Sequence, residues 1–204
     1  MIASRSTATW FSHRRPVLLA LAAMIAVSCA GPNTGDATYG PGASATPDPA
    51  ATAGMPNESP APPGACHFPN GDKSLPDPAC TPGETDPRVT QATIHQTICV
   101  PGWSKKVRPP VTVTEPIKSE RMAAYGMRGV SASEVELDHL IAITDGGATT
   151  RANLWPEYWV YAHKKDDLEV KIHEMICSGQ ITLAAGQQAL TVNWPASYQK
   201  YVGG

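Results

Sequence analysis

Four polar residues in the second half of the chain have the types and the order needed to activate a water molecule. Asp138 and His139 are adjacent, and Asn153 and His163 follow after a Gly-Gly loop. An imidazole titrates near neutral pH and can take a proton from water, while a carboxylate oxygen can bind a hard divalent cation. Hydrolysis of a phosphodiester needs both groups, because the water must lose a proton and the charge on the phosphate must be stabilised.

The residues around the acid–imidazole pair predict a strand. In residues 134–143 (EVELDHLIAI), Val135 and Leu137 alternate with Glu136 and Asp138, which indicates one apolar and one wet face. Adjacent strand residues point to opposite faces, so the pair can serve one site only where the backbone bends. The end of a strand that leads into a loop allows such a bend.

The downstream pattern predicts a second short strand and a long helix. After the loop TDGGATTRAN, residues 154–156 form an extended piece, and Leu168, Ile172 and Ile176 mark the apolar stripe of a helix over residues 161–178. The remaining pattern predicts helices over residues 89–99, 114–125, 182–192 and 195–202, and an extended piece over residues 103–113.

The segments ELDHLIAITDGG and NLWPEYWVYAHKKD resemble the HNH endonuclease motif of the ββα-metal nucleases. A wider likeness, from about Asp77 to Val202, is to a group of small exported bacterial proteins with a compact HNH-like centre. The resemblance implies that His139 is the general base, that Asp138 and His163 bind the metal, and that Asn153 pins the loop so that the base is oriented. It implies nucleic acid as the substrate and no nucleotide cofactor.

The cation expected at this site is divalent. An Asp ligand suits Mg²⁺ or Mn²⁺, while a His at the third position also allows Zn²⁺ or Ni²⁺. Together these features predict an α+β fold: a small, mainly helical domain around a ββα-metal (HNH-like) hairpin-helix core, stapled by disulfides, after a disordered linker.

Simpler interpretations of the same residues stay open. Asp138 and His139 can form a hydrogen-bonded pair without a metal, Asn153 can be a loop brace alone, and His163 can be a solvated residue beside Lys164 and Lys165. Asp166 and Asp167 can orient the His163 ring or reach the ion themselves. The alternative function is that of a catalytically inactive envelope lipoprotein acting as a binding module. A phosphodiesterase acting on a small or lipid-linked phosphate is a third possibility.

The start of the chain predicts export and a lipid anchor. Three arginines precede an uncharged apolar run over residues 17–27, which is too short to span a bilayer stably. The tetrapeptide that ends at Cys29 resembles the bacterial lipobox, which predicts a lipoprotein signal over residues 1–29 and a lipid-anchored domain at the outer face of the cytoplasmic membrane or in the cell envelope. Ordinary secretion and a twin-arginine route are the alternatives.

A spacer and a folded domain follow the signal. Residues 30–65 contain eight prolines and six glycines and predict a disordered spacer, because they offer too little apolar surface to offset the entropy of ordering. Residues 66–204 are enough for one small domain.

The net charge limits the interpretation further. Without the three arginines of the signal, 13 basic and 18 acidic residues remain, a formal charge of −5. A nucleic-acid-binding protein usually has a basic face, and here the basic residues form only a local patch: Lys105, Lys106 and Arg108, joined by Lys118, Arg121 and Arg128.

The four cysteines after Cys29 predict two disulfides in an exported domain. No pair has CxxC spacing, which argues against a zinc ribbon. Of the three possible pairings we favour Cys66–Cys80, which closes a Pro/Gly-rich loop, and Cys99–Cys177, which ties the start of the domain to its last third.

Overall fold

The computed structural model describes residues 59–203. The predicted signal, the lipid-acceptor Cys29 and most of the predicted spacer lie outside the described residues. The described end of the spacer contacts the domain, because Gly64 donates its backbone N–H to Ala123 O (2.9 Å) and Ala61 packs beside Tyr125 and its apolar neighbours.

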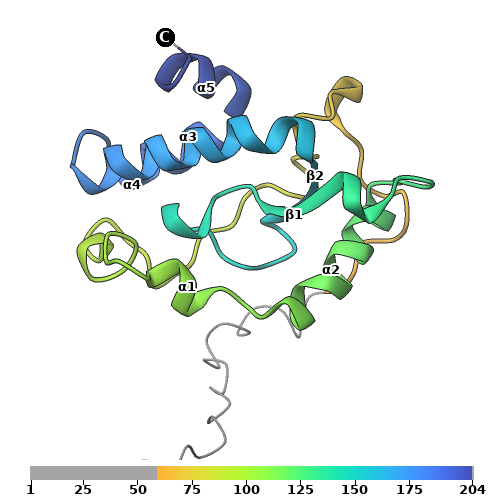
Figure 1. Ribbon diagram of the computed structural model, residues 1–204, viewed down its shortest axis with the longest axis horizontal. Coiled ribbons are helices and arrows are strands. Elements are labelled where there is room, and N and C mark those ends of the chain that lie inside the picture. The colour runs from red at the N-terminus through yellow and green to blue at the C-terminus, as the bar shows by residue number, and fades with distance from the viewer. Residues whose placement is uncertain (1–58, 204) are drawn as a thin grey trace, which may run out of the picture. The chain divides into compact units, whose positions relative to one another are not determined.

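The described residues combine helices with one small sheet, as an α+β class requires (Figure 1). Short 3₁₀ turns occupy residues 69–71, 94–96, 132–134 and 143–145. In chain order the helices and strands are α1 (Trp103–Val107), α2 (Val111–Ala124), β1 (Val135–His139), β2 (Leu154–Tyr158), α3 (Trp159–Cys177), α4 (Leu183–Thr191) and α5 (Trp194–Tyr201).

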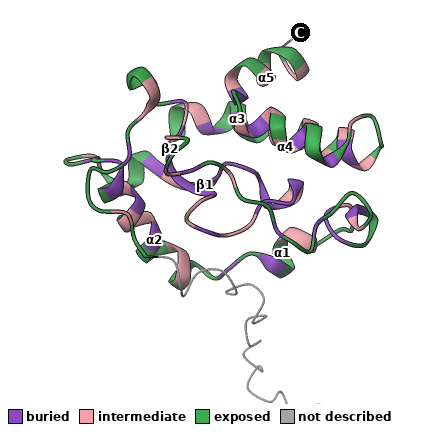
Figure 2. Ribbon diagram, turned by 180° about the vertical axis from the view of Figure 1, so that it is seen from behind, coloured by how far each residue is buried: buried purple, intermediate pink, exposed green. Residues whose placement is uncertain are grey.

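Strands β1 and β2 form an antiparallel pair that lies between helices α2 and α3 (Figures 1 and 2). The register places Glu136 opposite Glu157 and Asp138 opposite Trp155. Helix α3 begins at the residue after β2, so its first turns stay close to the hairpin. The order strand, loop, strand and helix predicted from residues 134–178 is therefore present.

Helix α3 is amphipathic, and its buried stripe forms the larger core. Leu168, Ile172 and Ile176 are fully buried against α4 and α5, which contribute Leu190 and Trp194. Gly186 lets α3 and α4 approach, since a Cβ there would lie 2.5 Å from the Ile176 side chain. The predicted α3, α4 and α5 agree with the observed helices to within two residues at each end.

Both favoured disulfides, Cys66–Cys80 and Cys99–Cys177, are present. They indicate an oxidising, extracytoplasmic environment. Among the described residues, no helix combines the length and the apolar character needed to cross a membrane.

Two predicted elements are wrong. Residues 89–99 form only one 3₁₀ turn, because the hydroxyls of Thr93 and Thr97 donate to backbone carbonyls (2.8 and 2.7 Å) and compete with a regular helix. Residues 103–113 are not extended, since α1 and the first turn of α2 occupy them.

The prediction for α2 placed its start too late. The helix begins after Pro110, three residues before Thr114, and Pro116 lies inside it. Pro116 is exposed, so the helix loses one backbone hydrogen bond at a position where water can replace it.

Candidate functional site

A cleft of about 340 Å³ lies where β1 ends, between the hairpin, α3 and the segment after α1. Its polar lining comes from elements far apart in the sequence, and this convergence makes it the candidate site. The titratable residues that line it are Arg108, Glu136, Asp138, His139, Asp166 and Glu169.

His139 lies at the wall of this cleft and is 7% exposed. Its Nε2 lies 3.0 Å from the Thr149 hydroxyl. Burial, together with the positive charges of Arg108 and Lys165, lowers the pKa of His139 to about 3. The imidazole is therefore neutral at neutral pH, which is the form that can accept a proton.

Asn153 is fully buried and braces the loop between the strands. Its Oδ1 accepts the backbone N–H of Ile141 (2.9 Å), and its Nδ2 donates to the carbonyls of Ile141 (2.9 Å) and Ala148 (2.8 Å). Gly147 completes the brace, because a Cβ there would lie 1.8 Å from Ile141 O and 2.8 Å from Asn153 Nδ2. The side chain thus fixes the backbone that follows His139. Its part in catalysis stays a prediction.

The carboxylate of Asp138 is held by one residue of β2 and one residue of α3. Its Oδ2 accepts the indole N–H of Trp155 (2.8 Å) and lies 2.8 Å from Lys165 Nζ. Lys165 is fully buried, donates to the backbone carbonyl of His139 (3.0 Å) and pairs with Glu169 one turn further along α3. The cation that faces the acid–imidazole dipeptide in this structure is therefore an ammonium group from α3.

The charge balance of this cluster is set by its carboxylates. Burial lowers the pKa of Lys165, but Asp138 and Glu169 outweigh it and raise the pKa above its ordinary value. Burial, and after it the charge of Lys165 and Asp138, leaves the pKa of Glu169 raised to about 8. Lys165 is therefore one cation among several neighbouring carboxyl groups.

Glu136, Asp138 and Glu157 form a group of three carboxyls. Each offers one oxygen, and these oxygens all lie within 4.8 Å of one another; in the part of the chain that is described, no other set of three His, Cys, Asp or Glu side chains meets this condition. Burial and the charge of Asp138 raise the pKa of Glu157 to about 10 and that of Glu136 to about 7. Such a group can hold a divalent cation.

His163 does not join this group. It is exposed and precedes Lys165 by two residues, which places the two side chains on nearly opposite sides of the helix, about 160° apart. The cleft lining includes Asp166 from the same helix but neither His163 nor Asp167. The structure brings together Asp138 and His139 and leaves His163 outside, so a ligand role for His163 stays a prediction without a geometric basis.

The basic residues divide into two kinds. Lys105 and Lys106 are exposed on α1, and the exposed Arg108 reaches the cleft without an ion pair among the described residues. Arg121 and Lys165, in contrast, are 2% and 0% exposed. These two residues are enclosed by protein acceptors, which leaves them no access to a phosphate in the cleft.

Sequence reasoning missed Glu136 in the cleft, and Glu157 and Lys165 in the charged cluster beside it. The alternation of β1 placed Glu136 and Asp138 on one face, which was the available signal for a paired carboxylate site. The position of Glu157 beside Glu136 follows only from the register of the two strands. The contact of Lys165 with Asp138 follows only from the direction in which α3 presents that side chain.

No protein-family model matches the chain, and neither the curated proteins nor the solved structures include a significant match to it.

Proposed function

We propose that the domain is an HNH-type phosphodiester hydrolase that cleaves nucleic acid with a divalent cation, and that the chain is anchored outside the cytoplasmic membrane through a lipid on Cys29. The observation that carries the proposal is the convergence of Asp138, His139 and Arg108 on one cleft. A carboxylate can hold the cation and an imidazole can activate the water, as the reaction requires, and a guanidinium can bind the phosphate.

His139 is the general base in this proposal. When its Nε2 donates to Thr149, the lone pair on Nδ1 is available to take a proton from a water in the cleft. Burial is the main cause of the low pKa of the imidazole, and the positive charges of Arg108 and Lys165 lower it further; an anionic substrate offsets these charges. Asn153 keeps the loop after His139 in place and so maintains the direction of the ring.

Arg108 is the phosphate-binding residue. It lines the cleft beside His139, and none of the described ion pairs involves it. A guanidinium in this position binds two phosphate oxygens at once. Lys105 and Lys106, exposed on the preceding turn, extend the positive charge along the backbone of a longer substrate.

One observation favours the alternative, a catalytically inactive binding module. Lys165 Nζ lies 2.8 Å from Asp138 Oδ2 and supplies a positive charge where a metal is expected. If this ammonium is the only cation of the site, the same scaffold can bind an anionic partner through Arg108 without hydrolysing it.

The test is a cleavage assay with the full-length chain in mild detergent. Supercoiled DNA, single-stranded RNA and a small phosphodiester are incubated separately with Mg²⁺, Mn²⁺, Ni²⁺ or Zn²⁺. We expect cleavage of a nucleic acid with at least one cation, and a fall of about 100- to 10,000-fold for His139→Ala. His95→Ala is the matched control, since His95 is exposed and lies outside the cleft.

Two results would contradict the hydrolase. One is the absence of cleavage with every cation, and the other is equal cleavage by the parent protein and His139→Ala. If a nucleic acid binds without cleavage and Arg108→Ala weakens that binding, the binding module replaces the hydrolase.

A further inference from the structure

The hairpin places three carboxylates on one side of its two strands. Glu136 and Asp138 are two residues apart on β1, so their side chains leave the same face, and Glu157 lies directly opposite Glu136 on β2. Like charges at facing positions destabilise a sheet unless something neutralises them. The arrangement therefore calls for a neutralising group between the strands.

Glu157 is an independent sign that this group is a bound cation. It is fully buried, and neither of its carboxylate oxygens has a hydrogen-bond partner in the described part of the chain. Asp145 is the other described residue with this property, but its carboxylate has His173 as a partner at 3.7 Å. Glu157 instead faces two further acids. A buried carboxyl group without a hydrogen-bond partner is rare, and coordination of a metal would supply the missing partner.

Asp138 has one oxygen to spare for such an ion. Its Oδ2 is occupied by the indole N–H of Trp155 and by Lys165 Nζ, both at 2.8 Å. No hydrogen bond to Oδ1 is present among the described residues. The lysine therefore fixes the orientation of the carboxylate and leaves the second oxygen for another cation.

We propose that Glu136, Asp138 and Glu157 form an all-carboxylate site for a hard divalent cation, in which Asp138 binds through Oδ1 and His163 takes no part. Three carboxylate oxygens suit Mg²⁺, Mn²⁺ or Ca²⁺ rather than Zn²⁺ or Ni²⁺, which favour imidazole or thiolate. The use of this ion in hydrolysis rests on the proposed function, but its binding does not.

The experiment measures binding of Mn²⁺ alone to the full-length chain, freed of metal with a chelator, by calorimetry and by the paramagnetic resonance signal of free Mn²⁺. We expect one site per chain in the parent protein. Glu157→Gln, which keeps the shape of the buried side chain, weakens binding by more than about 100-fold. His163→Ala and Asp167→Asn, both changes at exposed positions of α3 outside the cleft, alter it by less than about threefold.

The outcomes separate this site from the proposed function. Equal affinity of Glu157→Gln and the parent, or loss of binding in His163→Ala, overturns the site even if nucleic acid is cleaved. No binding of Mn²⁺ to the parent also overturns it. Binding that depends on Glu157 without any cleavage supports the site and contradicts only the hydrolase. Circular dichroism of each variant confirms that it is folded.

Discussion

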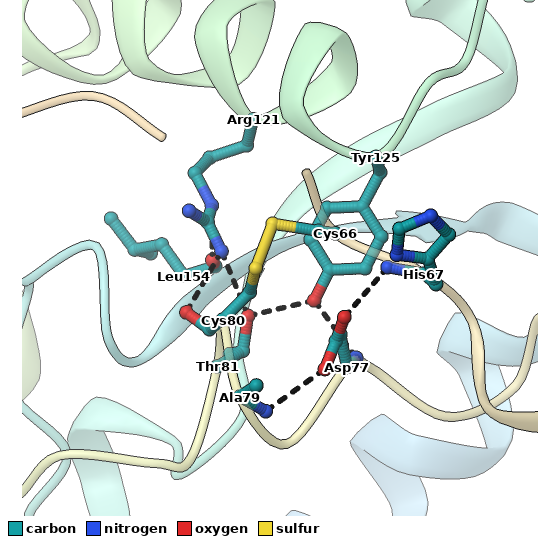
Figure 3. The surroundings of a disulfide bond; sticks show 9 residues. All are labelled: Cys66, His67, Asp77, Ala79, Cys80, Thr81, Arg121, Tyr125 and Leu154. Carbon is teal, nitrogen blue, oxygen red and sulfur yellow. Dashed lines mark hydrogen bonds between the residues drawn. A yellow bond between two sulfur atoms is a disulfide. The ribbon is translucent and has the colours of Figure 1, made fainter. Parts of the chain in front are cut away.

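The two helices that flank the hairpin each bury one cation, and the partners of these cations differ. Arg121 on α2 donates to the carbonyls of Leu154 (2.9 Å) and Cys80 (3.1 Å) and to the hydroxyl of Thr81 (2.9 Å), all of them uncharged (Figure 3). Lys165 on α3 pairs with two carboxylates, and further acids lie next to these.

The difference separates a side of the hairpin that stabilises the fold from the side on which we propose a binding site. Arg121 closes a satisfied network: the Thr81 hydroxyl lies 2.8 Å from the Tyr125 hydroxyl, which in turn accepts the backbone N–H of Asp77 (3.0 Å) (Figure 3). The group around Lys165 contains more carboxyl groups than basic groups and leaves Glu157 without a hydrogen bond. A satisfied network holds a fold together, whereas an unsatisfied one has capacity for a ligand.

The largest expected loss of stability comes from removal of a disulfide. In the chain-entropy model, loss of Cys99–Cys177, which joins residues 78 apart, costs about 4.5 kcal/mol. Loss of Cys66–Cys80, which joins residues 14 apart, costs about 3 kcal/mol. Paired Cys→Ser variants and urea unfolding measure both values. If removal of Cys66–Cys80 costs more stability than removal of Cys99–Cys177, the region around Arg121 depends on its disulfide more than the loop length predicts.

Lys165→Met is the next largest change and tests the comparison directly. Removal of the ammonium leaves Asp138 and Glu169 buried without a counter-charge, which costs about 4 kcal/mol. Because the acids remain, Mn²⁺ should restore part of the lost stability, as a ligand of the folded state does. Urea unfolding with and without Mn²⁺ measures the effect.

Arg121→Met is the matched control for that variant. Its partners are neutral, so the change costs about 2 kcal/mol for the acceptors left without a donor. Mn²⁺ should restore none of it beyond the gain in the parent protein. Equal rescue of both variants would contradict the distinction between the two sides.

Asn153→Ala tests whether the loop brace matters for the site as well as for the fold. It removes three hydrogen bonds inside the loop and costs roughly 2 kcal/mol, and any hydrolytic activity should fall because the backbone after His139 is released. Asn193→Ala, which removes the cap of α5, costs about 1 kcal/mol and should leave activity unchanged. If both variants keep full activity, Asn153 is only structural.

The last prediction is a dependence of stability on pH in the chelator-treated protein. The folded-state pKa values of Glu136 (about 7) and Glu157 (about 10) exceed the ordinary value of 4.5, so the folded state binds more protons than the unfolded state between pH 4.5 and these values. The free energy of unfolding should therefore fall as the pH rises through this window. Glu157→Gln should flatten the slope, and a stability that rises from pH 6 to 9 would contradict the assigned burial.

Local pattern predicted the elements that position the site but not the contacts within it. The alternation of β1, the apolar stripe of α3 and the cysteine positions were sufficient, because each depends on residues near in sequence or on chain connectivity. The segment from Trp103 to Val113 was misjudged, since two prolines that interrupt a strand also separate two helices.

The site itself was predicted in part. Asp138, His139 and Asn153 were placed correctly relative to the strand end and the loop, and the roles assigned to them remain predictions. His163 was expected at the site because the likeness gave its position in the sequence but not its direction on the helix. Glu157 and Lys165 depend on strand register and helix rotation, which no spacing in the sequence determines.

The most direct test of the central claim is a crystal structure of the protein soaked in Mn²⁺, with anomalous diffraction to locate the ion. The account predicts one ion bound to an oxygen of each of Glu136, Asp138 and Glu157, at about 2.1 to 2.2 Å. An ion held by His163, or three carboxylates that bind no ion while Lys165 alone faces Asp138, would contradict it.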